Sequence, residues 1–241
     1  MRLSCALTNT GRIRSRNEDY FKVDPSMGLY VLADGMGGAR GGDRASRIAV
    51  DTVFEVVQEN IKHDASALIE AVERANDKVL AEARRDPSLE GMGTTLLAAL
   101  DLGDDSFAIA SVGDSRAYLL DLQGLRTITE DQTWIQDVGR PLGLDEETLS
   151  RHPFRHVLTM AVGIGEAVDV RYYKVRLDPG STLLLSSDGL HGVISAGQIE
   201  TILRENAPGG NTLDEKCYHL IQAAREAGGP DNITAILIHS A

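Results

Sequence analysis

Four aspartates sit where apolar runs meet turns. Asp34 follows Val31–Ala33, Asp114 comes just after Phe107–Val112, Asp188 comes just after Leu183–Leu185, and Asp231 precedes Ile233–Ile238. Strands can bring such residues to one edge of a pair of sheets, where carboxylates repel one another unless protons or a cation neutralise them. Oxygen ligands without accompanying histidine or cysteine favour Mg²⁺ or Mn²⁺ over zinc. The pattern therefore predicts a divalent-metal site.

The alternative is that these aspartates are ordinary turn residues. Asp and Gly are common at strand ends because they satisfy local backbone hydrogen bonds, and any one Asp-Gly pair is best explained in that way. Four occurrences in one chain, together with Asn17-Glu18-Asp19 near a further strand, favour metal binding.

Three arginines, Arg12, Arg14 and Arg16, precede that acidic segment. The planar guanidinium matches the geometry of a phosphate group. Spacing alone does not distinguish a phosphate ligand among them from a solvated basic face.

Composition restricts the class of partner. The chain has 241 residues and a formal net charge of -12. An acidic protein repels nucleic acid, so we expect no nucleic-acid partner, and binding of a phosphorylated substrate would need cations between the two. Cys5 and Cys217 form no paired motif and are expected to be small buried residues, which fits a soluble protein of the reducing cytoplasm. No apolar run is long enough to span a membrane.

Periodicity predicts a mixed α and β protein. Alternating or continuous apolar runs predict strands, and apolar residues on one helical face, with capping boxes at Ser195 and Thr212, predict helices. The expected strands are 29–33, 94–100, 107–112, 117–120, 170–177, 183–185 and 233–238, and the expected helices are 43–58, 66–84, 195–204 and 212–227.

Short turns between strands favour antiparallel pairing, so the fold class is α+β, with helices on the outer faces of sheets. The absence of repeats and linkers predicts one domain over residues 1–241. Residues 131–156 have weak periodicity and predict an irregular flap with one short helix near 145–149. Within the flap, Trp134 is interpreted as packing rather than stacking on substrate.

Taken in order, the motifs resemble the metal-dependent protein phosphatases of the protein phosphatase 2C type, in their compact bacterial form. Each motif alone is weak, but together they run from about the tenth residue to the C-terminus. The matching segments are 11–19 (GRIRSRNED), 31–38 (VLADGMGG), 93–95 (GTT), 112–118 (VGDSRAY), 156–159 (HVLT), 184–190 (LLSSDGL) and 229–234 (GPDNIT).

The resemblance implies a four-layer α-β-β-α sandwich of two antiparallel sheets, with a dinuclear metal site at one end. By carry-over, Asp34 bridges two Mn²⁺ or Mg²⁺ ions, the Gly35 carbonyl helps to bind one, and Asp188 and Asp231 complete the other. The remaining roles are assigned in the same way: Glu18 and Asp19 hold metal-bound waters, Asp114 binds a third, weaker metal shared with Asp188, Arg14 binds the substrate phosphate, and Asn232 orients the neighbouring carboxylate.

The implied reaction is attack on phosphorus by a water that the metals activate, with Arg14 stabilising the phosphoryl oxygens. Two positions depart from the family pattern. Met36 stands where many eukaryotic members have a histidine proposed as general acid, so no histidine is assigned that role and a metal-bound water is hypothesised to supply the proton. Gln132 stands where relatives often have histidine, at the start of the flap, and could affect substrate selection.

The predicted function is therefore dephosphorylation of phosphoserine and phosphothreonine on proteins by a monomer that reverses a bacterial serine/threonine kinase. A non-enzymatic relative would usually have lost one of the metal ligands Asp34, Asp188 or Asp231, and all three are present. A hydrolase of small phosphate esters or nucleotides remains the other alternative, and a phosphothreonine peptide compared with small esters would separate the two.

Overall fold

Two antiparallel β-sheets form the centre of the protein in a computed structural model that describes residues 2–36, 41–60, 64–205 and 212–241. The first sheet has the order β1-β11-β10-β7-β8 and the second β2-β3-β5-β6-β9, with β4 paired to β3. The first comprises β1 (Arg2–Asn9), β11 (Ile233–Ser240), β10 (Thr182–Ser186), β7 (Arg116–Asp121) and β8 (Gly124–Thr127). The second comprises β2 (Asp19–Asp24), β3 (Leu29–Met36), β4 (Gly93–Thr94), β5 (Leu96–Asp101), β6 (Ser106–Val112) and β9 (Arg171–Arg176).

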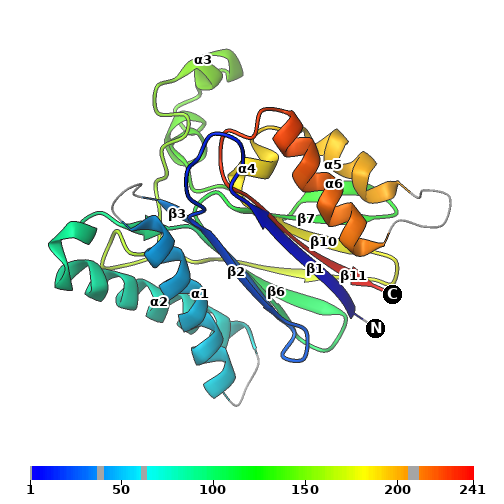
Figure 1. The fold of residues 1–241 in the computed structure, drawn as a ribbon, viewed down its shortest axis with the longest axis horizontal. Coiled ribbons are helices and arrows are strands. Elements are labelled where there is room, and N and C mark those ends of the chain that lie inside the picture. The colour runs from blue at the N-terminus through cyan, green and yellow to red at the C-terminus, as the bar shows by residue number, and fades with distance from the viewer. Residues whose placement is uncertain (1, 37–40, 61–63, 206–211) are drawn as a thin grey trace.

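Helices cover the outer face of each sheet (Figure 1). The long pair α1 (Gly42–Glu59) and α2 (Ala65–Arg85) packs on the second sheet, and α5 (Ala196–Arg204) and α6 (Leu213–Glu226) pack on the first. The predicted capping boxes at Ser195 and Thr212 are both formed. The α-β-β-α sandwich expected from the resemblance is therefore confirmed.

Strand alternation explains why the molecule has separate hydrophobic layers. In β3, Leu29, Val31 and Ala33 pack toward α1 and α2, whereas Tyr30 and Leu32 lie between the two sheets. Successive side chains of a strand point to opposite faces, so a continuous apolar run supplies two cores at once. The third core lies under α5 and α6 and contains both cysteines, which are free and buried as predicted.

The flap projects from the end of the sandwich opposite the two chain termini (Figure 1). It contains a turn of π-helix at Ile135–Gly139 and α3 (Glu146–Arg151), which matches the short helix expected there. Trp134 stacks on His152 with ring centroids 3.8 Å apart and an interplanar angle of 5°. Trp134 thus packs inside the flap, as the sequence predicted.

One predicted strand is interrupted. The run 94–100 divides into β4 and β5 at Thr95. Here the Asp34 backbone N–H donates to the Thr95 hydroxyl (3.0 Å), so a side chain takes part in the pairing of the two strands. Strands β1 and β8 carried no clear sequence signal. The turn expected at Gly37–Gly38 lies outside the described residues. Within the described ranges, no helix combines the length and apolar character needed to cross a bilayer.

Candidate metal and phosphate site

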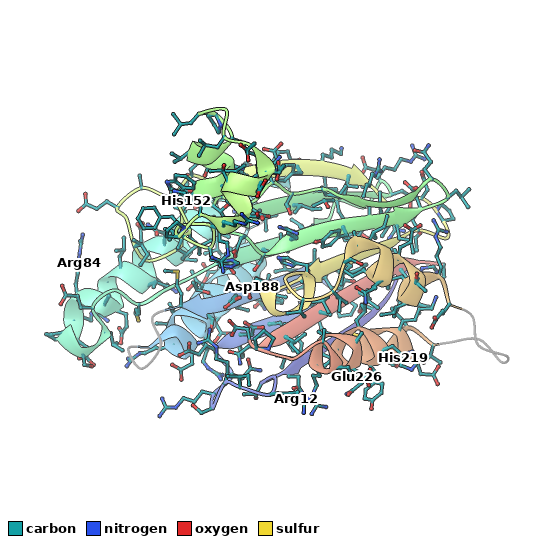
Figure 2. All side chains as sticks on the ribbon, turned by 90° about the horizontal axis from the view of Figure 1, so that it is seen from above. Arg12, Arg84, His152, Asp188, His219 and Glu226 are labelled. Atoms are coloured by element: carbon teal, nitrogen blue, oxygen red, sulfur yellow. The ribbon has the colours of Figure 1, made fainter. Side chains whose placement is uncertain are left out.

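The predicted site residues meet at the flap end of the sandwich. Asp34 lies near the end of β3, Asp114 in the β6–β7 turn, Asp188 at the first position of the one-turn helix α4 (Asp188–His191) after β10, and Asp231 just before β11. These four aspartates, Arg14, Glu18 and the Gly35 backbone line one cavity of about 400 Å³. Figure 2 shows Asp188 at the end of the sandwich from which the flap carrying His152 rises.

Asp34 is a carboxyl at the centre of this acidic group. Burial raises its pKa well above the ordinary value, and the nearby charges of Asp19, Asp188 and Asp114 raise it further. A carboxylate in such surroundings needs either a proton or a bound cation.

Asp19 lies beside Asp34 because β2 and β3 pair with Asp19 opposite Asp34. Its Oδ2 accepts hydrogen bonds from the Ser187 hydroxyl (2.8 Å) and the Thr234 hydroxyl (2.6 Å), whereas its buried Oδ1 has no partner. Burial raises the pKa of Asp19 to about 7, and the two hydroxyls oppose the shift. Asp188 also has a buried Oδ1 without a partner, and burial followed by the charge of Asp231 raises its pKa.

Asp114 reaches the same cavity from the β6–β7 turn. Burial raises its pKa to about 7, the charges of Asp188 and Asp131 add to the shift, and Arg116 opposes it. Arg116 is itself held by two hydrogen bonds to the Asp131 carboxylate at 2.8 and 2.7 Å. Most of its charge is therefore matched by Asp131, and the cavity remains strongly acidic.

Arg14 is the cation at the mouth of the cavity. Its Nη2 donates a hydrogen bond to Asp231 Oδ2 at 2.7 Å, and its side chain is 51% exposed. This contact and the charge of Asp231 raise the pKa of Arg14, so the guanidinium stays charged. Of the three arginines in this segment, Arg14 is the one that lines the cavity.

Asn232 fastens the arginine-bearing loop to the site. Its Oδ1 accepts the Glu18 backbone N–H (2.8 Å), and its Nδ2 donates to the carbonyls of Thr10 (3.0 Å) and Arg16 (2.9 Å). Its backbone N–H donates to Asp231 Oδ1 at 2.8 Å. One buried amide thus fixes both the loop that carries Arg14 and the carboxylate of Asp231.

Two glycines allow close backbone approach in the site. A Cβ atom on Gly35 would lie 2.2 Å from the Gly42 carbonyl oxygen and 2.6 Å from that of Glu18. A Cβ atom on Gly189 would lie 1.9 Å from the Asn232 carbonyl oxygen. Both distances are far below contact, so these positions require glycine for packing reasons.

The donor set fits hard divalent cations. Among the residues that the structure describes, no three His, Cys, Asp or Glu side chains are arranged as a ready-made metal site. Mg²⁺, however, commonly takes only one or two carboxylates and keeps several waters. The partnerless buried oxygens of Asp19 and Asp188, and the raised pKa of each aspartate from burial, are what an acidic site built for cations would show.

Residues of the flap base complete the cavity, and the sequence interpretation gave them no site role. His156, Val157 and Leu158 line it, and His156 weakly opposes the rise that burial and Asp231 cause in the pKa of Asp188. Thr95 lines it as well, while its hydroxyl lies 2.8 Å from that of Ser115. The motifs at 93–95 and 156–159 were the only sequence signals that could have found them.

Comparison with known proteins places this geometry in a family. A family model described as protein phosphatase 2C matches residues 12–237. The serine/threonine phosphatase stp of Listeria monocytogenes is 36% identical over 239 residues, which cover 96% of this chain and 93% of the relative. The chain belongs to the protein phosphatase 2C family.

Solved structures agree with that assignment. The serine/threonine phosphatase of S. agalactiae superposes with a TM-score of 0.90 at 30% identity and covers 100% of both chains. The catalytic domain of the protein phosphatase PstP, solved in complex with two manganese ions, gives a TM-score of 0.85 at 30% identity and covers 99% of this chain and 97% of that one.

Proposed function

We propose that this protein is a metal-dependent serine/threonine phosphatase that hydrolyses phosphoserine and phosphothreonine on proteins. The observation that carries the proposal is the meeting of four aspartates, Glu18 and Arg14 in one cavity. Acidic groups that share a low-dielectric site must bind cations or protons, and a guanidinium at the mouth of the cavity can bind a phosphoryl group.

Asp34, the Gly35 carbonyl, Asp188 and Asp231 would hold two Mn²⁺ or Mg²⁺ ions, and Asp114 would hold a weaker third. Glu18 and Asp19 would accept hydrogen bonds from waters around the ions. Bound divalent ions supply positive charge and lower the pKa of a water near the phosphorus. The assignment accounts for how so acidic a protein can accept an anionic substrate.

The chain's own residues orient the substrate. Arg14 is half exposed and paired with Asp231, so it can turn its free donors toward two phosphoryl oxygens while one contact to Asp231 remains. Asn232 holds both the loop that carries Arg14 and the Asp231 carboxylate in place through its hydrogen bonds. Val157 and Leu158, at the base of the flap, give the cavity an apolar wall.

The direct test is hydrolysis of a phosphothreonine peptide with Mn²⁺, with Mg²⁺ and with EDTA. We expect activity that requires the metal and is lost in Asp188→Ala. The matched control is Asp178→Ala, because Asp178 is an exposed turn aspartate whose carboxylate pairs with Arg176 on the surface. Folded wild type without activity in Mn²⁺ would favour a phosphoprotein-binding role instead, and activity that survives EDTA and Asp188→Ala would refute the site assignment.

Substrate and setting are further parts of the proposal. We infer that the protein reverses a serine/threonine kinase, acts as a monomer, and forms one catalytic domain over residues 1–241. Two buried free thiols, Cys5 and Cys217, support a reducing cytoplasmic location. Faster hydrolysis of small phosphate esters than of phosphopeptides would show that small esters, and not proteins, are the substrates. Sedimentation measures whether the protein is a monomer.

A further inference from the structure

Gln132 lies at the point where the flap leaves the sandwich. The residue is buried, with 2% of its surface exposed. The flap neck is formed here by residues 132–134 and 157–159, which pair through the Thr133–Leu158 bridge. The Thr159 backbone N–H donates to the Gln132 carbonyl at 3.0 Å, and the Trp134 N–H donates to the Val157 carbonyl at 2.8 Å. Gln132 is therefore part of the segment that fixes the flap.

Gln132 also forms hydrogen bonds with the turn that carries Asp114. Gln132 Oε1 accepts the Gly113 backbone N–H at 2.8 Å, and the Gln132 backbone N–H donates to the Gly113 carbonyl at 2.9 Å. Its Nε2 donates to the Asp169 carbonyl at 2.8 Å. The amide thus uses its acceptor on one segment and its donor on another.

The opposite side of that turn is closed by Thr95. Gly113 has a φ of +95°, and a Cβ atom there would lie 2.7 Å from Thr95 Cγ2. Because Thr95 leaves no space, the turn cannot move away from Gln132 without disturbing the residue that also binds the Asp34 backbone. The position of Asp114 consequently depends on the contact between Gln132 and Gly113.

We propose that Gln132 is a positioning residue that locks the Gly113–Asp114 turn to the flap neck, and so sets the strength with which Asp114 binds a divalent cation. This inference rests on the proposed metal-dependent function. The sequence alone suggested that Gln132 could affect substrate selection; in the structure its buried side chain contacts Gly113 and Asp169, which do not line the cavity. Residues that orient metal ligands commonly change metal affinity by about 10- to 100-fold when they are altered.

The test measures Mn²⁺ binding by calorimetry on metal-free protein, without any substrate. Asp114→Asn first identifies the weak site in the wild-type isotherm. We expect Gln132→Met to weaken that site by about tenfold. Gln132→His should keep the Mn²⁺ affinity of that site within about threefold of wild type, because a neutral imidazole also offers one donor and one acceptor.

Asn76→Leu is the matched control. Asn76 is another buried amide, whose Oδ1 accepts the Gly163 N–H at 2.8 Å and whose Nδ2 donates to the Gly165 carbonyl at 3.0 Å, so its hydrogen bonds go to a segment other than the Asp114 turn. Its loss should lower the unfolding temperature, as we also expect for Gln132→Met, but should leave the weak Mn²⁺ site unchanged. If Gln132→Met does not fold, Gln132→Asn, which is one methylene shorter, takes its place.

Three results would overturn the inference: unchanged Mn²⁺ binding in Gln132→Met or its replacement, an equal loss in Asn76→Leu, or a wild-type isotherm with no site sensitive to Asp114→Asn. Failure of the proposed function is a different result. It would appear as Mn²⁺ binding of the expected pattern in a wild type that hydrolyses no phosphopeptide.

Discussion

Replacing Asp114 by asparagine should make the metal-free protein less sensitive to pH. The ordinary pKa of this carboxyl is 3.8, and burial with the charge of Asp188 raises it to about 7 in the folded protein. Between the two values only the folded state holds the proton. The stability that protonated Asp114 contributes is therefore fully present below the pKa of the unfolded state and is lost as the pH rises through the pKa of the folded state.

The size of the effect follows from that shift. While only the folded state is protonated, the free energy of unfolding falls by about 1.4 kcal/mol per pH unit. From pH 5 to pH 8 this amounts to about 2.7 kcal/mol for the one group, since the slope vanishes near pH 7. Asp114→Asn keeps the side-chain shape and has no proton to lose, so its unfolding free energy should lack this part of the decline.

The assay is urea denaturation in EDTA at pH 5 and pH 8 for wild type and Asp114→Asn. Burial lowers the pKa of His191 and His239, so these groups add stability as the pH rises toward 6.5, but they do so in both proteins and cancel in the difference. Equal pH dependence in the two proteins, or a steeper decline in the variant, would refute the reasoning. Saturating Mn²⁺ at pH 8 should restore wild-type stability, because a ligand that binds only the folded state stabilises it.

Three further outcomes are expected. Arg14→Lys should lower kcat/KM for a phosphopeptide by about tenfold, since an ammonium group cannot hold Asp231 and two phosphoryl oxygens in one plane, and an unchanged value would remove Arg14 from phosphate binding. His156→Ala should leave the single-turnover rate within about threefold, whereas a loss of about a hundredfold or more would identify His156 as the general acid. Gly189→Ala should lower the free energy of unfolding by about 1–3 kcal/mol, measured by urea denaturation, because its Cβ would clash with the Asn232 carbonyl; Gly197→Ala, where a Cβ meets nothing within 4 Å, is the control.

The sequence by itself was sufficient for the class of fold and for the identity of the acidic residues. Apolar runs that end in Asp34 and Asp188, and the helix caps at Ser195 and Thr212, are local signals, and local hydrogen bonding and periodicity determine such features. Their order along the chain was enough to indicate the family. Strand β1 was missed because it lacks a regular alternation of apolar and polar residues, and Cys5 is its one buried residue.

The tertiary structure alone decided how those residues act on one another. The register of β2 and β3 sets Asp19 beside Asp34, and the fold turns Gln132 away from the cavity while bringing His156 to its lining. The resemblance had pointed to Arg14, and in space this arginine reaches Asp231, 217 positions away in the chain, and lines the cavity, whereas its two neighbours do not line it. Burial, charge coupling and hydrogen bonds between distant segments depend on distances in space, and the spacing of residues along a sequence does not contain those distances.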